Sequence, residues 1–202
     1  MTKTRLGFLV SHRGSNMQAI VDACNSGRLD AVPAVLISNN ASCQALQRAA
    51  KESIPCYIAN SGICADTGLS PDEFILGRLL EHRVDLVVLA GYMKKVGSAI
   101  LNRYAGRILN IHPSLLPKYG GQGMYGLRVH EAVLAAGETE TGATVHLVGA
   151  DYDQGPVLAQ ERVPVKPDDT ATTLAARVLE MEHKLLVETL SKVIRGEIAT
   201  QP

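Results

Sequence analysis

The amino-acid sequence predicts an α/β fold, with a mostly parallel central sheet flanked by helices and an antiparallel portion in the C-terminal half. Through the first half, short apolar runs alternate with longer segments of helical period, which is typical of a parallel sheet. Residues Val84–Ala90 are almost all apolar, as expected of a strand covered on both faces. In the second half, two apolar runs flank the turn-rich sequence GADYDQGP, which indicates antiparallel pairing.

In the first half, the periodicity of the apolar residues locates the elements. Ser70, Pro71 and Glu73 have the spacing of a capping box at a helix start. Ser42 is expected to cap the helix Ser42–Glu52. Residues 60–70 show no clear period and are expected to be irregular. The expected strands are Leu6–Val10, Val32–Ser38, Ile54–Ala59 and Val84–Ala90, and the expected helices are Asn16–Ser26, Ser42–Glu52, Pro71–His82 and Ser98–Tyr104.

The second half is expected to be a strand followed by a helix, a strand pair and a long final helix. The final helix is nucleated by Asp168-Asp169-Thr170, and its apolar residues suit packing on one face of a sheet. The expected strands are Arg107–Ile111, Gly142–Val148 and Val157–Pro164, and the expected helices are Val129–Ala136, ending at Gly137, and a helix to about Arg195, ending at Gly196.

Length and composition restrict the class of protein. The 202 residues suffice for one well-buried domain and are few for two, so we expect a single domain over residues 1–202. Twenty basic and twenty acidic residues balance to zero net charge, so no overall field favours nucleic acid or a membrane. The apolar run Leu6–Val10 is too short for a signal peptide or a membrane span, which favours the cytoplasm. The four cysteines form no C-x-x-C pair, which favours reduced thiols.

The turn after the first strand is a candidate anion site. Gly14, Ser15 and Asn16 stand at the expected start of a helix, where backbone N–H groups and the helix dipole attract a phosphate or carboxylate. The turn matches neither the dinucleotide fingerprint nor the Walker loop. The alternative is an ordinary tight turn in which Ser15 caps the helix. His12 and Arg13 either help to hold an anion or are simply solvated.

The loop LAGYMKKVG, residues 89–97, follows the most apolar strand. Ligands of open α/β sheets bind outside the carboxyl ends of the strands, where this loop is expected to lie. Gly91 allows close approach of the backbone to a ligand, and Tyr92 and Met93 offer apolar contact. The alternative is a loop with a core methionine and surface lysines.

A third candidate lies at the end of a strand, in the sequence NIHPSLLPKY. Asn110 and His112 are two residues apart, so on a strand they point to the same face. An amide beside an imidazole is suited to holding a developing oxyanion and moving a proton, and Pro113 and Pro117 stiffen the exit of the chain. The alternative is that Asn110 satisfies loop backbone groups and His112 merely lies where the strand surfaces.

Acidic residues supply the remaining candidates. Asp151 and Asp153 stand in the turn between the last two strands, and a carboxylate near His112 would raise its pKa and orient its tautomer. Ordinary turn chemistry is the alternative for both. Glu182 and His183 stand in the final helix, where an acidic surface is the ordinary interpretation.

These segments, in this order, resemble the glycinamide ribonucleotide formyltransferases of de novo purine synthesis, from about Leu6 to Ile194. The sequences that carry the resemblance are Gly14-Ser15-Asn16, LAGYM, LNIHPSLLPKY, GATVHLV, DYDQGPVL and ARVLEMEH. The resemblance implies a Rossmann-like formyltransferase fold. It also implies transfer of a formyl group from 10-formyltetrahydrofolate, as cosubstrate, to the amine of the ribonucleotide, with no metal and no tightly bound cofactor.

The resemblance further implies the roles of particular residues. Asn110 and His112 would stabilise the oxyanion, with His112 as proton donor, and Asp153 would keep His112 protonated and carry a proton through ordered water. His146 would support them. Implied substrate-binding residues are Gly14, Ser15, Asn16 and Glu182, and implied folate-binding residues are Met93, Lys94, Lys95, Val96, Asn110, Gly149, Ala150, Asp151, Tyr152 and Asp153. The ribonucleotide would then bind in the half at about 1–105, and folate binding and catalysis would lie in the half at about 106–202.

The sequence differs from the family pattern at some positions, and other functions of related proteins are alternatives to formyl transfer to the ribonucleotide. His12-Arg13 replaces the Gly-Asn or Gly-Thr of relatives and makes the loop less open or more cationic, and the glycine-rich residues 120–127 suggest a lid. Formyltetrahydrofolate deformylase is expected to carry an additional N-terminal domain, and methionyl-tRNA formyltransferase an additional C-terminal one. A sugar-nucleotide formyltransferase and a binding module without catalysis are further rivals. The expected partners are small molecules, without nucleic acid or membrane, for a monomer or homodimer.

Overall fold

The computed structural model describes residues 3–200, which group into two compact units. The first comprises residues 3–109 with 199–200, and the second is Asn110–Ile198. Over residues 3–200 the strands follow the order β3-β2-β1-β4-β5-β6-β7 in one seven-stranded mixed sheet, which confirms the predicted fold class. That residues 1–202 act as one domain stays a prediction.

The first unit is built on parallel strands. β1 (Thr4–Val10) pairs in parallel with β2 (Ala31–Ser38) and with β4 (Leu86–Leu89), and β2 pairs in parallel with β3 (Cys56–Ile58). The core-facing residues of β1 and β4 are fully or almost fully buried, as the continuous apolar runs predicted. Because these strands are parallel, the loops that follow them lie at the same, carboxyl edge of the sheet.

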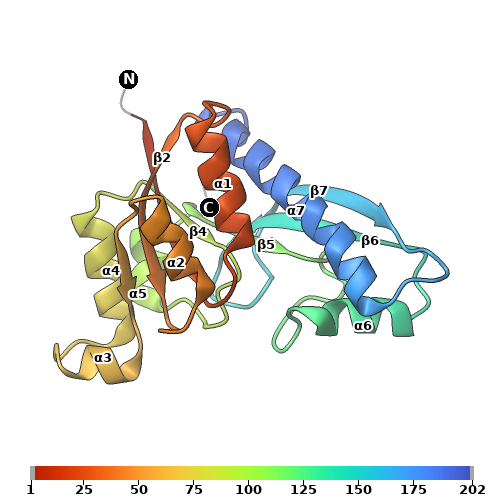
Figure 1. Cartoon of the computed structure of the whole chain (residues 1–202), viewed down its shortest axis with the longest axis horizontal. Helices are drawn as coiled ribbons and strands as arrows, with labels where there is room; N and C mark the ends of the chain where they lie inside the picture. The colour runs from red at the N-terminus through yellow and green to blue at the C-terminus, as the bar shows by residue number, and fades with distance from the viewer. Residues whose placement is uncertain (1–2, 201–202) are drawn as a thin grey trace. The chain divides into compact units, whose positions relative to one another are not determined.

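Helices α1 (Ser15–Asn25) and α2 (Gln44–Lys51) lie side by side, and α4 (Pro71–Glu81) packs next to α5 (Ser98–Arg103), as Figure 1 shows. The predicted capping box of α4 is confirmed. The Ser70 hydroxyl accepts a hydrogen bond from Glu73 N, and the Glu73 carboxylate accepts one from Ser70 N. The capping box therefore starts α4 at the residue that the sequence predicted.

Two local predictions for this unit are wrong. Ser42 does not cap α2, because its N–H and hydroxyl both donate to Asn40 Oδ1 in a turn, and Cys43 takes the cap position. Residues 60–70 are not all irregular, because α3 (Ser61–Ala65) forms there, with Asn60 Oδ1 accepting from Ile63 N. The helix has five residues, too few for an apolar period to be visible.

The second unit begins within β5 (Ile108–His112). It contains β6 (Glu140–Leu147) and β7 (Val157–Pro164), which pair antiparallel as predicted. Helices α6 (Leu127–Ala135) and α7 (Ala171–Ile194) pack on each other, and α7 also packs on β6 and β7. This arrangement covers β6, which is buried along almost its whole length.

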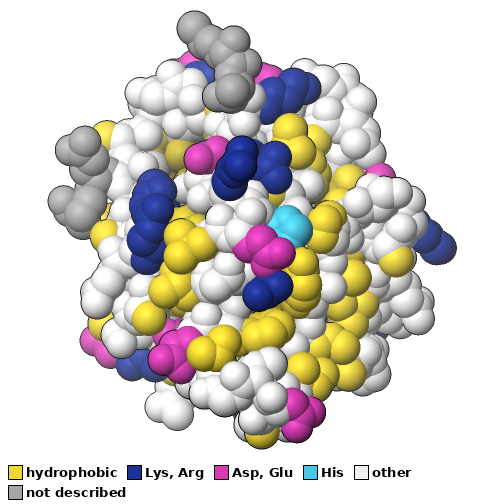
Figure 2. Space-filling model, turned by 90° about the vertical axis from the view of Figure 1, so that its left-hand side faces the viewer, with side chains coloured by type: hydrophobic (Ala, Val, Ile, Leu, Met, Phe, Trp, Pro, Cys, Tyr) yellow, Lys and Arg dark blue, Asp and Glu magenta, His cyan; other side chains and the backbone are white. Residues whose placement is uncertain are grey.

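The described surface carries mixed charge. The side of the molecule that bears α3 and α4 in Figure 1 shows apolar, basic and acidic side chains interspersed, without a broad field of one sign (Figure 2). Within residues 3–200, no helix combines the length and apolar character that a membrane span requires.

The capping box of α4 gives a test of the local structure. Replacing Ser70 with alanine removes the hydroxyl that binds Glu73 N, so we expect the free energy of unfolding to fall by about 1 kcal/mol. Urea denaturation measures this change. Ser70→Thr keeps the hydroxyl and should retain most of the stability; equal losses in the two variants would show that the cap contributes nothing.

Candidate active site

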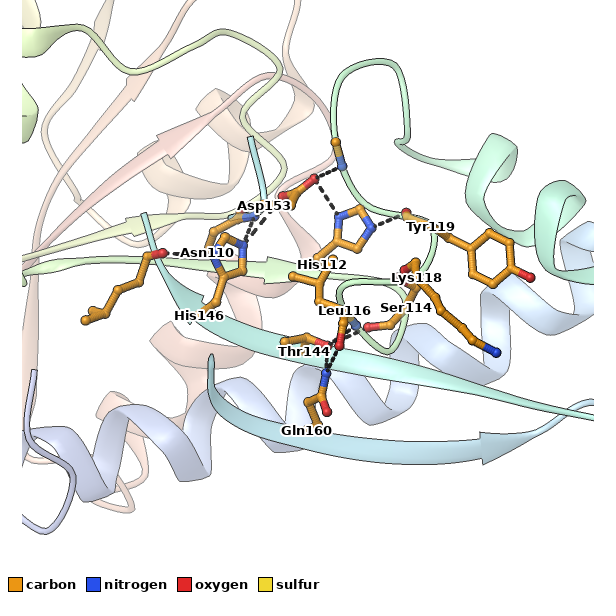
Figure 3. Close-up of polar contacts among 12 residues, drawn as sticks. Asn110, His112, Ser114, Leu116, Lys118, Tyr119, Thr144, His146, Asp153 and Gln160 are labelled. Carbon is orange, nitrogen blue, oxygen red and sulfur yellow. Dashed lines mark hydrogen bonds and ion pairs between the residues drawn. The ribbon is translucent and has the colours of Figure 1, made fainter. Parts of the chain in front are cut away.

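The carboxylate of Asp153 lies at the centre of a polar cluster in the second unit (Figure 3). Its Oδ2 accepts a hydrogen bond from Gly121 N at 2.8 Å and lies 3.5 Å from His112 Nδ1. Its Oδ1 lies 3.5 Å from both His146 Nε2 and Asn110 Nδ2. The side chain of Asp153 is only 11% exposed, so these contacts replace most of the water that an ionised carboxylate needs.

The turn between β6 and β7 places Asp153. Its backbone φ is 55°, a left-handed value that Asp tolerates better than most residues. Gly155 lies directly against the Leu147 carbonyl oxygen, where a Cβ would clash, and Leu147 N donates to Pro156 O at 2.9 Å. The sequence DQGP therefore closes the turn tightly enough to bring the carboxylate back over β5 and β6.

β5 and β6 supply the partners of this carboxylate. Asn110 and His112 point to the same side of β5, as the strand period predicted, and both approach Asp153. Asn110 Nδ2 donates to His146 Nε2 at 3.0 Å, and His146 Nδ1 donates to Leu147 O at 2.9 Å. Nδ1 of His146 is thus directed at the Leu147 carbonyl, and Nε2 faces Asn110 and Asp153.

His112 is 4% exposed and is held at both ring nitrogens. Nε2 donates to Tyr119 O at 2.8 Å, which leaves Nδ1 facing Asp153. Burial lowers the pKa of His112 by more than the Asp153 carboxylate and the Tyr119 carbonyl raise it, so the pKa lies below the ordinary value of 6.5. The carboxylate acts in the expected direction but burial outweighs it, so the net shift of the His112 pKa is opposite to the expected one, and the role of Asp153 in keeping His112 protonated stays a prediction.

Asp153 itself stays ionised. Burial raises the pKa of this carboxyl group, but the contacts with His146, His112 and Gly121 together lower it below the ordinary value of 3.8. An imidazole that loses its proton more readily than usual thus lies beside a charged carboxylate. The arrangement can donate hydrogen bonds from Asn110 to a developing negative charge and can stabilise a proton that arrives at Nδ1 of His112.

Residue types could not reveal two partners in this cluster, because they are backbone groups. The Gly121 amide and the Tyr119 carbonyl both belong to the irregular segment between β5 and α6. The only signal in the sequence is the glycine-rich stretch after LPKY, which also suggests a lid. That residues 120–127 act as a lid stays a prediction.

In the first unit, the loop between β1 and α1 contains the predicted anion site, whose role stays a prediction. Gly14 takes the N-cap position with a left-handed φ of 69°, and a Cβ there would run into Ala45. Ser15 is the first helical residue, so the alternative in which Ser15 caps the helix is wrong. Asn16 is 8% exposed, whereas His12 and Arg13 are exposed.

α2 fixes this loop through backbone contacts. His12 O accepts from Ala45 N at 3.2 Å, and Arg13 O accepts from Arg48 Nε at 3.0 Å. These bonds leave the side chains of His12 and Arg13 on the outside. The loop is therefore more cationic than a Gly-Asn or Gly-Thr sequence would be.

A hollow of about 450 Å³ opens beside this loop and contains part of the predicted folate segment. Met93 is half-buried and its N–H donates to Ser11 Oγ at 2.8 Å, while Lys94 and Lys95 are exposed and Val96 is buried. The residues that line the hollow are Ser11, His12, Asn39, Asn40, Ala41, Asn60, Met93 and Lys94.

The other predicted binding residues lie in the second unit. Glu182 on α7 is 8% exposed, so the interpretation of this part of α7 as an acidic surface is wrong for that residue. Within residues 3–200, no group of His, Cys, Asp and Glu side chains is arranged to hold a metal ion. Gly149, Ala150, Asp151 and Tyr152 are exposed before the Asp153 turn.

His130 on α6 gives a pH-dependent test of the second unit. It is 4% exposed, and burial, together with the nearby His112, lowers its pKa from 6.5 to about 4. Its Nδ1 makes no hydrogen bond within the described residues. Because the unfolded chain binds the proton more readily, stability is complete above about pH 6.5 and falls towards pH 4, by a total of roughly 3 kcal/mol from this group.

We therefore expect urea denaturation to show a smaller loss of stability on acidification through this window in His130→Leu than in the original chain. The variant removes the titrating group and keeps an apolar side chain of similar bulk. Parallel stability curves for the two proteins would contradict the assignment.

Comparison with known proteins agrees with this architecture. The formyl transferase family model matches residues 4–190. A phosphoribosylglycinamide formyltransferase of Haemophilus influenzae is 40% identical over 90% of this chain and 82% of its own length. The chloroplastic phosphoribosylglycinamide formyltransferase of Vigna unguiculata is 40% identical over 97% of the chain, which spans 62% of that protein's length.

Among solved structures, glycinamide ribonucleotide transformylase 1 from Symbiobacterium toebii superposes with a TM-score of 0.89 at 35% identity, covering 100% of this chain and 95% of that one. The structural match and the family match thus both cover nearly the whole chain. The chain belongs to the formyl transferase family, in the group of the phosphoribosylglycinamide formyltransferases.

Proposed function

We propose that this chain transfers the formyl group of 10-formyltetrahydrofolate to the amine of N1-(5-phospho-D-ribosyl)glycinamide, in de novo purine biosynthesis. The products are the N2-formyl ribonucleotide and tetrahydrofolate. Membership of the formyl transferase family supports this class of reaction. The observation that carries the proposal is the approach of Asn110 and His112 to the buried Asp153 carboxylate.

The reaction needs a group that accepts negative charge on the formyl oxygen. The neutral amine attacks the formyl carbon, so a C–N bond forms and the carbonyl oxygen becomes an oxyanion. Asn110 Nδ2 donates a hydrogen bond to that oxygen, and Nδ1 of His112 donates a second one after it has taken up, through ordered water, the proton that the attacking amine loses. When the intermediate collapses, the bond to the folate nitrogen breaks, that nitrogen gains a proton and the amine loses one.

Asp153 governs the proton in this scheme. The carboxylate stabilises the imidazolium form of His112, while burial makes the imidazolium a stronger acid. A proton held between these opposing effects is readily given to the oxyanion. Asp153 also carries the proton from the amine to the folate nitrogen through ordered water, and the Asn110–His146 bond keeps the amide directed at the site.

The remaining assignments follow the family pattern. Gly14, Ser15 and Asn16 bind the phosphate with backbone N–H groups at the start of α1, and Glu182 contacts the ribose or the glycinamide. The folate is a cosubstrate that binds and leaves in each cycle. Its contacts are Met93, Lys94, Lys95, Val96, Asn110, Gly149, Ala150, Asp151, Tyr152 and Asp153.

Dependence on the acceptor distinguishes this reaction from folate deformylation. With purified protein, formation of tetrahydrofolate from 10-formyltetrahydrofolate should require the ribonucleotide, because the amine is the only intended acceptor. Absorbance follows the folate and a coupled assay measures free formate. Formate released at the same rate without the ribonucleotide would identify a deformylase instead.

Removal of the imidazole tests the assigned proton donor. We expect His112→Ala to lower kcat by about 10²–10⁴-fold, because positioned proton transfer contributes that much. The variant loses the bond to Tyr119 O, so its urea midpoint is measured in parallel.

His82→Ala serves as the control, because His82 is bonded to the Tyr57 hydroxyl in the first unit and has no assigned role. A folded His112→Ala variant with the turnover of the control would remove His112 from the mechanism.

A further inference from the structure

The segment that follows His112 is held by side chains from the antiparallel strand pair. Thr144 Oγ1 on β6 donates to Ser114 O at 2.6 Å and accepts from Leu116 N at 3.1 Å. Gln160 Nε2 on β7 donates to Thr144 Oγ1 at 2.9 Å and to Leu116 O at 2.8 Å. The Thr144 hydroxyl thus uses its one donor and both acceptor positions, and Thr144 is fully buried.

The sheet register holds these two side chains together. Thr144 and Gln160 are direct partners in the pairing of β6 with β7, so both project from the same face of the sheet beneath the segment (Figure 3). A charge or length change at either position therefore acts on the same loop backbone. The segment is therefore fixed to the strand pair β6 and β7.

Further hydrogen bonds fix the same segment as far as Tyr119. Ser114 Oγ donates to Lys118 O at 2.6 Å, which closes the turn immediately before Tyr119. Tyr119 has a left-handed φ of 56°, and its hydroxyl donates to Glu138 Oε1 at 2.9 Å. These contacts aim the Tyr119 carbonyl at His112 Nε2.

We propose that Thr144 and Gln160 are positioning residues for His112. By fixing residues 114–119 they keep the Tyr119 carbonyl on Nε2, so that the neutral imidazole carries its proton on Nε2 and presents Nδ1 to Asp153. Both residues act through the backbone of this segment. The catalytic consequence rests on the proposed function, whereas the effect on the imidazole tautomer does not.

A positioning role and a merely structural role differ in their effect on the His112 imidazole. A structural role lowers the free energy of unfolding and leaves the imidazole of the folded molecules unchanged. A positioning role changes where the proton lies on His112, because a carbonyl that drifts from Nε2 no longer favours that tautomer. The ring nitrogens of the two tautomers have different ¹⁵N chemical shifts, so NMR separates the two roles.

The test compares Thr144→Val with a matched variant on the same strand. Thr141 is 3% exposed, and its hydroxyl makes no hydrogen bond within residues 3–200, so Thr141→Val removes an equivalent group with no partner. The proteins are labelled with ¹⁵N-histidine, and the His112 signals are assigned by their loss in His112→Ala. We expect the Nε2-protonated form in the original chain and in Thr141→Val, and a mixture of tautomers in Thr144→Val.

Kinetics give the second readout. Thr144→Val should lower kcat by roughly 10- to 100-fold with little change in KM, because a small misplacement of a reacting group slows the chemical step. Thr144→Ser restores the hydroxyl and should recover both kcat and the tautomer. If Thr144→Val does not fold, Gln160→Leu removes only the amide donors from an exposed edge-strand residue and should shift the tautomer in the same direction.

A folded Thr144→Val or Gln160→Leu protein with the tautomer of the original chain would overturn the proposal. Absence of formyl transfer in the original chain would instead overturn the proposed function, and the NMR comparison would still decide the positioning role.

Discussion

The buried carboxylate of Asp153 is the interaction on which the site depends. An ionised group that is 11% exposed requires polar partners, and here they come from separate parts of the second unit: β5, β6 and the segment that contains Gly121. Each of these partners is positioned by its contact with the Asp153 carboxylate. The tight turn at Gly155 and the left-handed backbone of Asp153 are the local conditions that allow this meeting.

At His112, burial and charge oppose each other. Burial alone would leave an inert neutral imidazole, and the carboxylate alone would leave a permanent imidazolium with little tendency to release its proton. With both present, the pKa lies below 6.5 and the proton has a defined place to go when negative charge develops nearby. The Tyr119 carbonyl completes the balance, because it engages the other ring nitrogen. The sequence NIHPSLLPKY thus supplies both the imidazole and the carbonyl that binds one of its ring nitrogens.

Sequence patterns predicted what depends on residue type and period. The strands of the sheet, the capping box at Ser70 and the common face of Asn110 and His112 all follow from such patterns. Contacts made by backbone atoms do not, which is why the roles of Tyr119 O and Gly121 N were missed. The net pKa of His112 was also misjudged, because the degree of burial at the end of a strand depends on packing by distant segments.

The central claim is that the Asp153 carboxylate raises the pKa of a buried His112, and an NMR titration of the imidazole tests it most directly. The pKa of His112 is measured in the original chain and in Asp153→Asn, which keeps the shape of the side chain and removes its charge. We predict a pKa below 6.5 in the original chain and a still lower pKa in the variant. An unchanged or higher pKa in Asp153→Asn would contradict the account.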